Sequence, residues 1–202
     1  MPTVTTDHQL ANLALGFVGQ RQFLDSLNED SEEGECCAIY YPLARDSCLK
    51  ARAWRFATRR SVLALSAETR TDWDYVYTAP NNLLTAHEIY TGIRNPPHSR
   101  RIPFALELND AGTGHLILTD QEQAELIYTA QLNIVALWPA DFVEAVAWRL
   151  ACYLALALPV KPQLAGSLEP IARRALLIAA AADQNAVTPD QAPDSEFILE
   201  RA

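Results

Sequence analysis

The sequence predicts an α+β protein, mainly α, in which a helical bundle carries a small inserted antiparallel β-rich lobe. Apolar residues recur at the spacing of an α-helix before residue 60 and again after residue 136. Between these stretches apolar residues alternate with polar ones, and proline and glycine divide the chain. The expected division is a first helical part over 1–60, the β-rich lobe over 61–135, a second helical part over 136–185 and a flexible carboxyl-terminal tail over 186–202.

The first helical part should contain two helices. The first begins at Thr6-Asp7, because threonine caps helices and apolar residues follow at helical spacing. The second follows the acidic run over 29–33, with Ser31 as its cap, since negative charge favours the positive end of the helix dipole. Pro42 predicts a kink or a local rearrangement, and the helix should end near 54–58. Its buried stripe is expected to be Cys37, Tyr41, Ala44, Cys48 and Ala51.

The middle stretch should form a small sheet. Its first strand is expected to have two different faces. The aromatic face carries Trp73, Tyr75 and Tyr77, and the solvated face carries Asp72, Asp74, Val76 and Thr78. The aromatic residues fit a core, and also a subunit interface. Residues 104–108 form a second strand, 109–114 a turn and 115–119 a return strand, which together make a β-hairpin. Residues 125–130 are expected to complete the sheet.

A third helix is expected to begin at Pro139, because proline suits the first helical turn. Apolar residues cover most of its circumference up to Leu158, so this helix should be the centre of the bundle. Pro159 and Pro162 end it. A last helix over 168–183 is expected to bury Leu168, Ile171, Ala175, Ile178 and Ala182.

The acidic composition argues against a protein that grips DNA. The net charge is −9, whereas affinity for DNA phosphates comes from Lys and Arg side chains that release counterions. An acidic surface is compatible with a wall past which DNA slides without sticking, and also with an ordinary soluble surface. Half of the residues are hydrophobic and a fifth are charged, which suffices for a sizeable core in one domain.

Cysteine usage and hydropathy indicate a soluble protein made inside the cell, without a membrane contact. The cysteines have no disulfide or zinc spacing and are expected to be buried free thiols: Cys36, Cys37, Cys48 and Cys152. The first eight residues lack the basic and apolar regions of a secretory signal. The apolar run over 143–158 contains Glu144 and Arg149 and is too short to span a bilayer.

The sequence nominates no catalytic set, so we expect no enzyme, no cofactor and no metal site. The run over 87–91 begins like a metalloprotease helix but lacks the second histidine four residues on. No G-x-S-x-G elbow and no glycine-rich phosphate loop is present. Asp72 and Asp74 alternate with aromatic residues, which favours a solvated strand face over a paired-carboxylate site.

Three basic groups are candidate contacts with a neighbouring subunit or another protein. The pair Arg45-Asp46 would form an ion pair across a subunit boundary, or a local surface pair worth less than about 1 kcal/mol. The arginines at the expected helix end would complement the helix dipole or contact a neighbour: Arg52, Arg55, Arg59 and Arg60. The arginines around 96–98 would dock on a partner protein or lie in a solvated loop: Arg94, Arg100 and Arg101. The tail adds one apolar anchor, which would order on assembly: Phe197, Ile198 and Leu199.

Three aromatic-rich signatures occur in a fixed order along the chain. The first covers 40–46 and runs on to 54–60, the second covers 73–77 and is closed by Pro80, and the third covers 138–142. In this order they resemble the tail tubular protein A family of short-tailed phages, over roughly residues 8–158.

The resemblance implies a structural virion protein at the head-to-tail junction, present in the host cytoplasm during assembly. Members of that family form a dodecameric ring that docks under the portal protein and extends the DNA channel. Double-stranded DNA would pass through without sequence-specific binding, and a downstream tail or nozzle protein would attach below. The paired Tyr40-Tyr41 with Pro42, and the acidic carboxyl-terminal end, depart from the family pattern.

Two other functional classes remain open. A cytosolic helical regulator or small-molecule-binding module would be a monomer or dimer with an enclosed apolar pocket. A tail-associated polysaccharide hydrolase would need two carboxylates about 5–10 Å apart in a cleft, and the sequence nominates no such pair.

Overall fold

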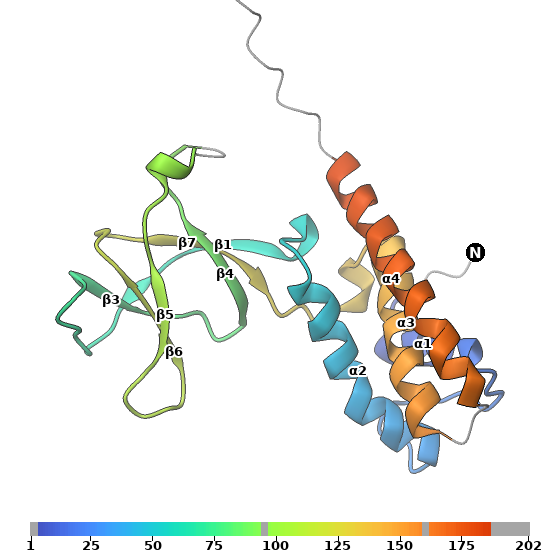
Figure 1. Ribbon diagram of the computed structural model, residues 1–202. Coiled ribbons are helices and arrows are strands. Elements are labelled where there is room, and N and C mark those ends of the chain that lie inside the picture. The colour runs from blue at the N-terminus through green and yellow to red at the C-terminus, as the bar shows by residue number, and fades with distance from the viewer. Residues whose placement is uncertain (1–3, 94–96, 159–161, 187–202) are drawn as a thin grey trace, which may run out of the picture.

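The computed structural model describes residues 4–93, 97–158 and 162–186. Over these residues the chain forms four α-helices and seven β-strands, with a helical part and a β part side by side (Figure 1). The strands make two antiparallel sheets, ordered β1-β7-β4 and β2-β3-β6-β5. The expected fold class is therefore wrong: the protein is an α+β fold with two sheets, not a helical bundle that carries a small β-rich lobe.

The helices begin where the sequence caps them. Thr6 accepts a hydrogen bond from the Gln9 amide and Ser31 accepts one from the Gly34 amide, which confirms both predicted caps. The α-helices are α1 (Asp7–Phe17), α2 (Glu32–Lys50), α3 (Ala140–Ala157) and α4 (Pro162–Asn185). Short 3-10 turns also occur at η1 (Arg55–Ala57), η2 (His98–Arg100) and η3 (Val135–Leu137).

Two helices differ from expectation. Helix α2 continues through Pro42 and ends at Lys50, earlier than predicted, and η1 occupies the expected end. Helix α4 begins at Pro162, because proline is tolerated in a first turn. Its buried residues are mostly small, namely Leu168, Ala172, Ala175 and Ala179. Ile171, Ile178 and Ala182, predicted to be buried, are exposed, the two isoleucines at 41% and 53%, because the face of α4 that packs on α3 is the one that carries Ala172, Ala175 and Ala179.

The β part contains more strands than the sequence pattern indicated. The predicted hairpin is confirmed, with Leu108 opposite His115, and so is the strand over 125–130. Strands β1, β2 and β4 were not predicted, because their residues do not alternate between exposed and buried positions. The strands are β1 (Thr58–Val62), β2 (Ala64–Leu65), β3 (Tyr75–Thr78), β4 (Leu83–Ile89), β5 (Ala105–Leu108), β6 (His115–Thr119) and β7 (Glu125–Ala130).

Strand β3 is covered on both faces. Val76, expected on a solvated face, is 5% exposed and packs with Leu116 and Leu118. Trp73 lies before the strand and packs against this cluster, not beside the tyrosines. Tyr77 is buried on the opposite face, in a core that both sheets share. The simple alternation predicted for this strand is therefore wrong at Trp73 and Val76.

Helix α3 is the centre of the helical part, as predicted, since it contacts each of the other three α-helices. In the β part, the two sheets pack over a common core that includes Tyr77, Ile117 and Leu126. Helix α2 contacts β4 where the two parts meet. Within the described ranges, no helix has both the length and the apolar character needed to cross a bilayer.

Candidate functional site

Two of the three aromatic signatures meet in space. Trp54 and Phe56 lie at η1, and Phe142 lies in the first turns of α3. The Phe142 ring centroid is 4.9 Å from that of Trp54 and 4.8 Å from that of Phe56, and Trp138 adds an edge-on contact at 5.2 Å. The Trp54 indole nitrogen also donates to the Cys48 carbonyl at 2.8 Å, so the cluster fixes the chain just after α2.

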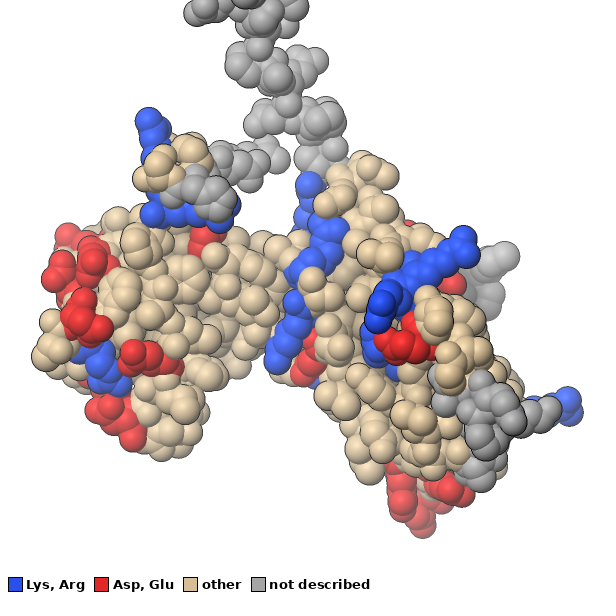
Figure 2. Space-filling model, viewed as in Figure 1, with Lys and Arg blue, Asp and Glu red and all other residues tan. Residues whose placement is uncertain are grey.

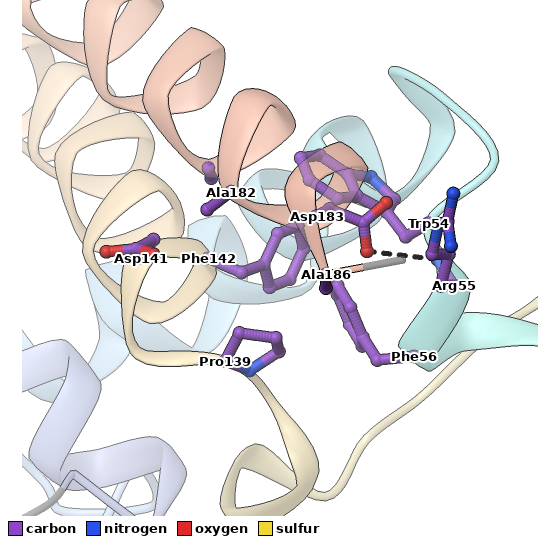
Figure 3. A pocket seen from close by; sticks show the side chains of 10 residues that line it. Trp54, Arg55, Phe56, Pro139, Asp141, Phe142, Ala182, Asp183 and Ala186 are labelled. Atoms are coloured by element: carbon purple, nitrogen blue, oxygen red, sulfur yellow. Dashed lines mark hydrogen bonds between the residues drawn. The ribbon is translucent and has the colours of Figure 1, made fainter. Parts of the chain in front are cut away.

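A hollow of about 330 Å³ opens beside this cluster (Figure 3). Its aromatic wall comes from Trp54, Phe56 and Phe142, and its other wall is the last turns of α4. This volume is at the lower end of the range for ligand pockets, about 300–1,000 Å³. The full lining is Trp54, Arg55, Phe56, Pro139, Asp141, Phe142, Ala179, Ala182, Asp183 and Ala186.

Asp183 brings an unsatisfied oxygen to the hollow. Its side chain is 7% exposed, and its Oδ1 accepts from the Arg55 amide at 3.2 Å. Its Oδ2 has no hydrogen-bond partner among the described residues, although the Arg52 guanidinium lies 3.8 Å away. That distance suits charge pairing but exceeds a hydrogen bond. The buried carboxylate can therefore accept a further donor.

Arg45 and Asp46 form an ion pair within one chain. Arg45 Nε donates to Asp46 Oδ1 at 2.7 Å, and Arg45 is 8% exposed. Gln131, just after β7, donates from Nε2 to Asp46 Oδ2 at 3.0 Å. The pair thus links α2 to the end of the β part, a contact that the sequence did not reveal because Gln131 is distant along the chain.

The other predicted basic residues lie mainly in the β part. Arg60 stacks on Tyr90, with its guanidinium carbon 3.7 Å from the ring centroid and its Nε 3.8 Å from a Glu125 oxygen. Figure 2 shows basic side chains at the end of the β part that carries η2. Arg59, Arg100 and Arg101 are exposed. Arg94, Phe197, Ile198 and Leu199 lie outside the described residues.

Acidic groups lie mostly at the extremities of the view in Figure 2. In the helical part they include the first turn of α2, with Glu32, Glu33 and Glu35. In the β part, one network joins Arg70 to Glu68, Glu107 and Asp110 at 3.1–3.3 Å. Most other basic side chains on this face lie between these regions, with single acidic groups beside them, so the two signs of charge are mixed there.

Burial affects the protonation of three thiols and one imidazole. Burial raises the pKa of Cys37 and of Cys48 to about 12, and that of Cys152 to about 11, so these thiols stay protonated near neutral pH. Burial lowers the pKa of His87, whose Nε2 lies 2.7 Å from Thr129 Oγ1. Across the described parts of the chain, no three His, Cys, Asp or Glu side chains gather as metal ligands.

No protein-family model matches the chain, and a comparison with curated proteins also gives no match. Sequence reasoning singled out Trp54, Phe56 and Phe142 as parts of signatures but did not bring them together. It also missed Asp183, because nothing local distinguishes an aspartate near a helix end from a solvated one.

Proposed function

We propose that this protein is a structural virion protein, a head-to-tail adaptor. It forms a ring that docks on a portal, extends the DNA channel and provides the attachment platform for a tail. The observation that carries the proposal is the ordered set of aromatic signatures, of which the first and third pack into one cluster around Phe142. A resemblance that falls on residues in mutual contact is stronger support than the same number of scattered matches.

The exposed surface supports subunit association. A ring forms from a heterologous contact, in which one surface of a subunit meets a different surface of the next. Helix α2 exposes Ile39 and Leu43 at 67% and 53%, and α4 exposes Leu177 and Ile178 at 66% and 53%. Each helix packs on α3, and α2 and α4 have little contact with each other, so these are two separate apolar surfaces.

The charge supports a channel wall. A net charge of −9 disfavours tight binding to DNA phosphates, which a protein lining a DNA path must avoid. The protein is proposed to act at the head-to-tail junction of the virion after assembly in the host cytoplasm. We propose a structural role for it, not an enzymatic one.

The test combines purified protein with the portal protein of the genome that encodes it, followed by electron microscopy. The expected result is a ring bound to the portal. Ile39→Glu and Leu177→Glu should each abolish the ring while circular dichroism stays unchanged, because a charge enters an apolar contact. Val62→Glu, at a residue 70% exposed on β1, is the matched control and should leave the ring intact. Absence of any portal-bound ring with the unmodified protein would contradict the proposal.

A second candidate function, a small-molecule-binding module, is favoured by the hollow beside Trp54. It would place the protein in the cytosol as a monomer or dimer without a virion role. A screen of apolar ligands by thermal shift distinguishes the two, because binding to the native state raises the unfolding temperature. Saturable binding without portal association would favour this second function.

A further inference from the structure

We infer that the hollow lined by Trp54, Phe56, Phe142 and Asp183 is the docking site of the chain's own carboxyl-terminal segment. The segment is residues 187–202, and its anchor is Phe197-Ile198-Leu199. The docking occurs within one chain. This inference is independent of the adaptor proposal, because it concerns the isolated protein.

The segment begins beside the hollow, so it is long enough to reach it. Ala186, the last residue of the described range 162–186, itself lines the hollow. Phe197 follows eleven residues later by numbering (197 − 186), a contour of at most about 40 Å. A flexible tether of that length has a root-mean-square span of about 17–20 Å. Such tethers give effective concentrations in the millimolar range, so a weak site is filled within one chain before a second chain competes.

The chemistry of the segment matches the wall of the hollow. Its one run of consecutive large apolar residues is Phe197-Ile198-Leu199, and apart from Val187 and two prolines the rest is polar, charged or alanine. An aromatic side chain can pack edge-on against the Trp54 and Phe142 rings. The hollow has room for about one large side chain with part of its neighbour, which suits a short anchor better than a helix.

The polar groups of the hollow also suit an extended segment. Asp183 Oδ2 is buried and unsatisfied, and a backbone N–H of the docked segment would donate to it. The segment carries more acidic than basic residues, and Arg55 lies on one side of the hollow while Asp141 lies on the other (Figure 3). Entry along the Arg55 side therefore joins opposite charges and avoids Asp141.

The test places the photo-crosslinker p-benzoylphenylalanine at position 197 of the whole chain, at low micromolar concentration. After irradiation, the adduct is mapped by peptide mass spectrometry. The expected result is a crosslink within one chain to the peptides that contain Trp54 and Phe56, or Phe142. Crosslinks that join two chains, crosslinks to other elements, or no crosslink would each overturn the inference.

A matched pair of variants checks that the hollow itself is the site. Ala182→Trp fills it from α4 without removing any buried side chain, since Ala182 is exposed and lines it. This variant should reduce the crosslink yield at least tenfold. Ala181→Trp, also exposed but not in the lining, should leave the yield unchanged. Equal yields in the two variants would overturn the inference, and circular dichroism verifies that both are folded.

Discussion

At the scale of one residue, the half-buried His87 of β4 should make the stability of the protein depend on pH. The His87 pKa is lowered from its usual value of 6.5 by burial, and only in part offset by Glu88. The unfolded chain therefore binds more protons than the native chain just below pH 6.5, and stability falls as the pH falls through this window. Neutral His87 can donate to or accept from Thr129, whereas protonated His87 can only donate and carries its charge into a half-buried site.

We predict that His87→Gln flattens the fall in unfolding free energy between pH 7 and pH 5. The measurement is a series of urea titrations over this pH range. His115→Gln, at an exposed position, is the control and should retain the fall. If the unmodified protein and His87→Gln lose stability equally, His87 is not the responsible group.

The helical core gives a second prediction at the scale of one side chain. Leu150 lies on α3 and is fully buried, so Leu150→Ala should cost about 2–5 kcal/mol of unfolding free energy. Asp74→Asn, at an exposed residue, should change it by less than about 0.5 kcal/mol. Denaturant titration of both variants measures the difference. A severe loss at Asp74 would instead reopen the possibility of a carboxylate site there.

At the scale of elements, the start of α2 depends on a glycine. A Cβ on Gly34 would clash with the backbone oxygen of Glu29, because the chain before the helix folds back over its first turn. The same turn is capped by Ser31. Gly34 therefore has a structural role that composition does not reveal, since a glycine early in a helix otherwise carries only a small cost.

We predict opposite signs for two glycine substitutions. Gly34→Ala should destabilise the protein by about 1–3 kcal/mol, because the clash is with backbone and cannot relax easily. Gly166→Ala, in α4 with open space around it, should stabilise by up to about 1 kcal/mol. Thermal unfolding of both variants decides the point. Stabilisation by Gly34→Ala would show that the preceding loop can move away.

The sequence correctly predicted the features that depend on residues close together along the chain. The caps at Thr6 and Ser31 and the hairpin around 109–114 depend on neighbouring residues, and the structure confirms them. The buried face of α4 depends on how closely α3 approaches, and the central position of β7 depends on partners far along the chain. The same holds for the candidate site. The sequence shows Arg45 and Asp46 as adjacent opposite charges, but it does not show that Gln131 contacts Asp46 or that Asp183 lines the hollow.

At the scale of the whole molecule, one hydrogen-bonded contact between the two parts runs through the Arg45-Asp46 pair of α2. It is largely buried and continues through Gln131 into the end of the β part. Removing one partner of a buried pair leaves an uncompensated charge, whereas replacing both with apolar residues is often nearly neutral. Substitutions at the pair therefore measure how much this contact contributes to the free energy of unfolding.

We predict that Asp46→Ala destabilises the protein more than the double variant Arg45→Met with Asp46→Leu. The single change should cost near the lower end of the ~3–5 kcal/mol typical of buried pairs. The reason is that the Asp46 side chain is still 26% exposed. Chemical denaturation measures both variants. A cost below about 1 kcal/mol for Asp46→Ala would class the pair with ordinary surface ion pairs.

The distribution of tryptophans supplies optical reporters for each part. Trp54, Trp138 and Trp148 belong to the helical part, whereas Trp73 alone lies in the β part. Trp73 is half-buried beside Val76, while Trp54 is fully buried. A protein that keeps only Trp73 would report the melting of the sheets by fluorescence, and one that keeps only Trp54 would report the helices. Whether their midpoints coincide would show directly whether the molecule melts as one cooperative unit or as two.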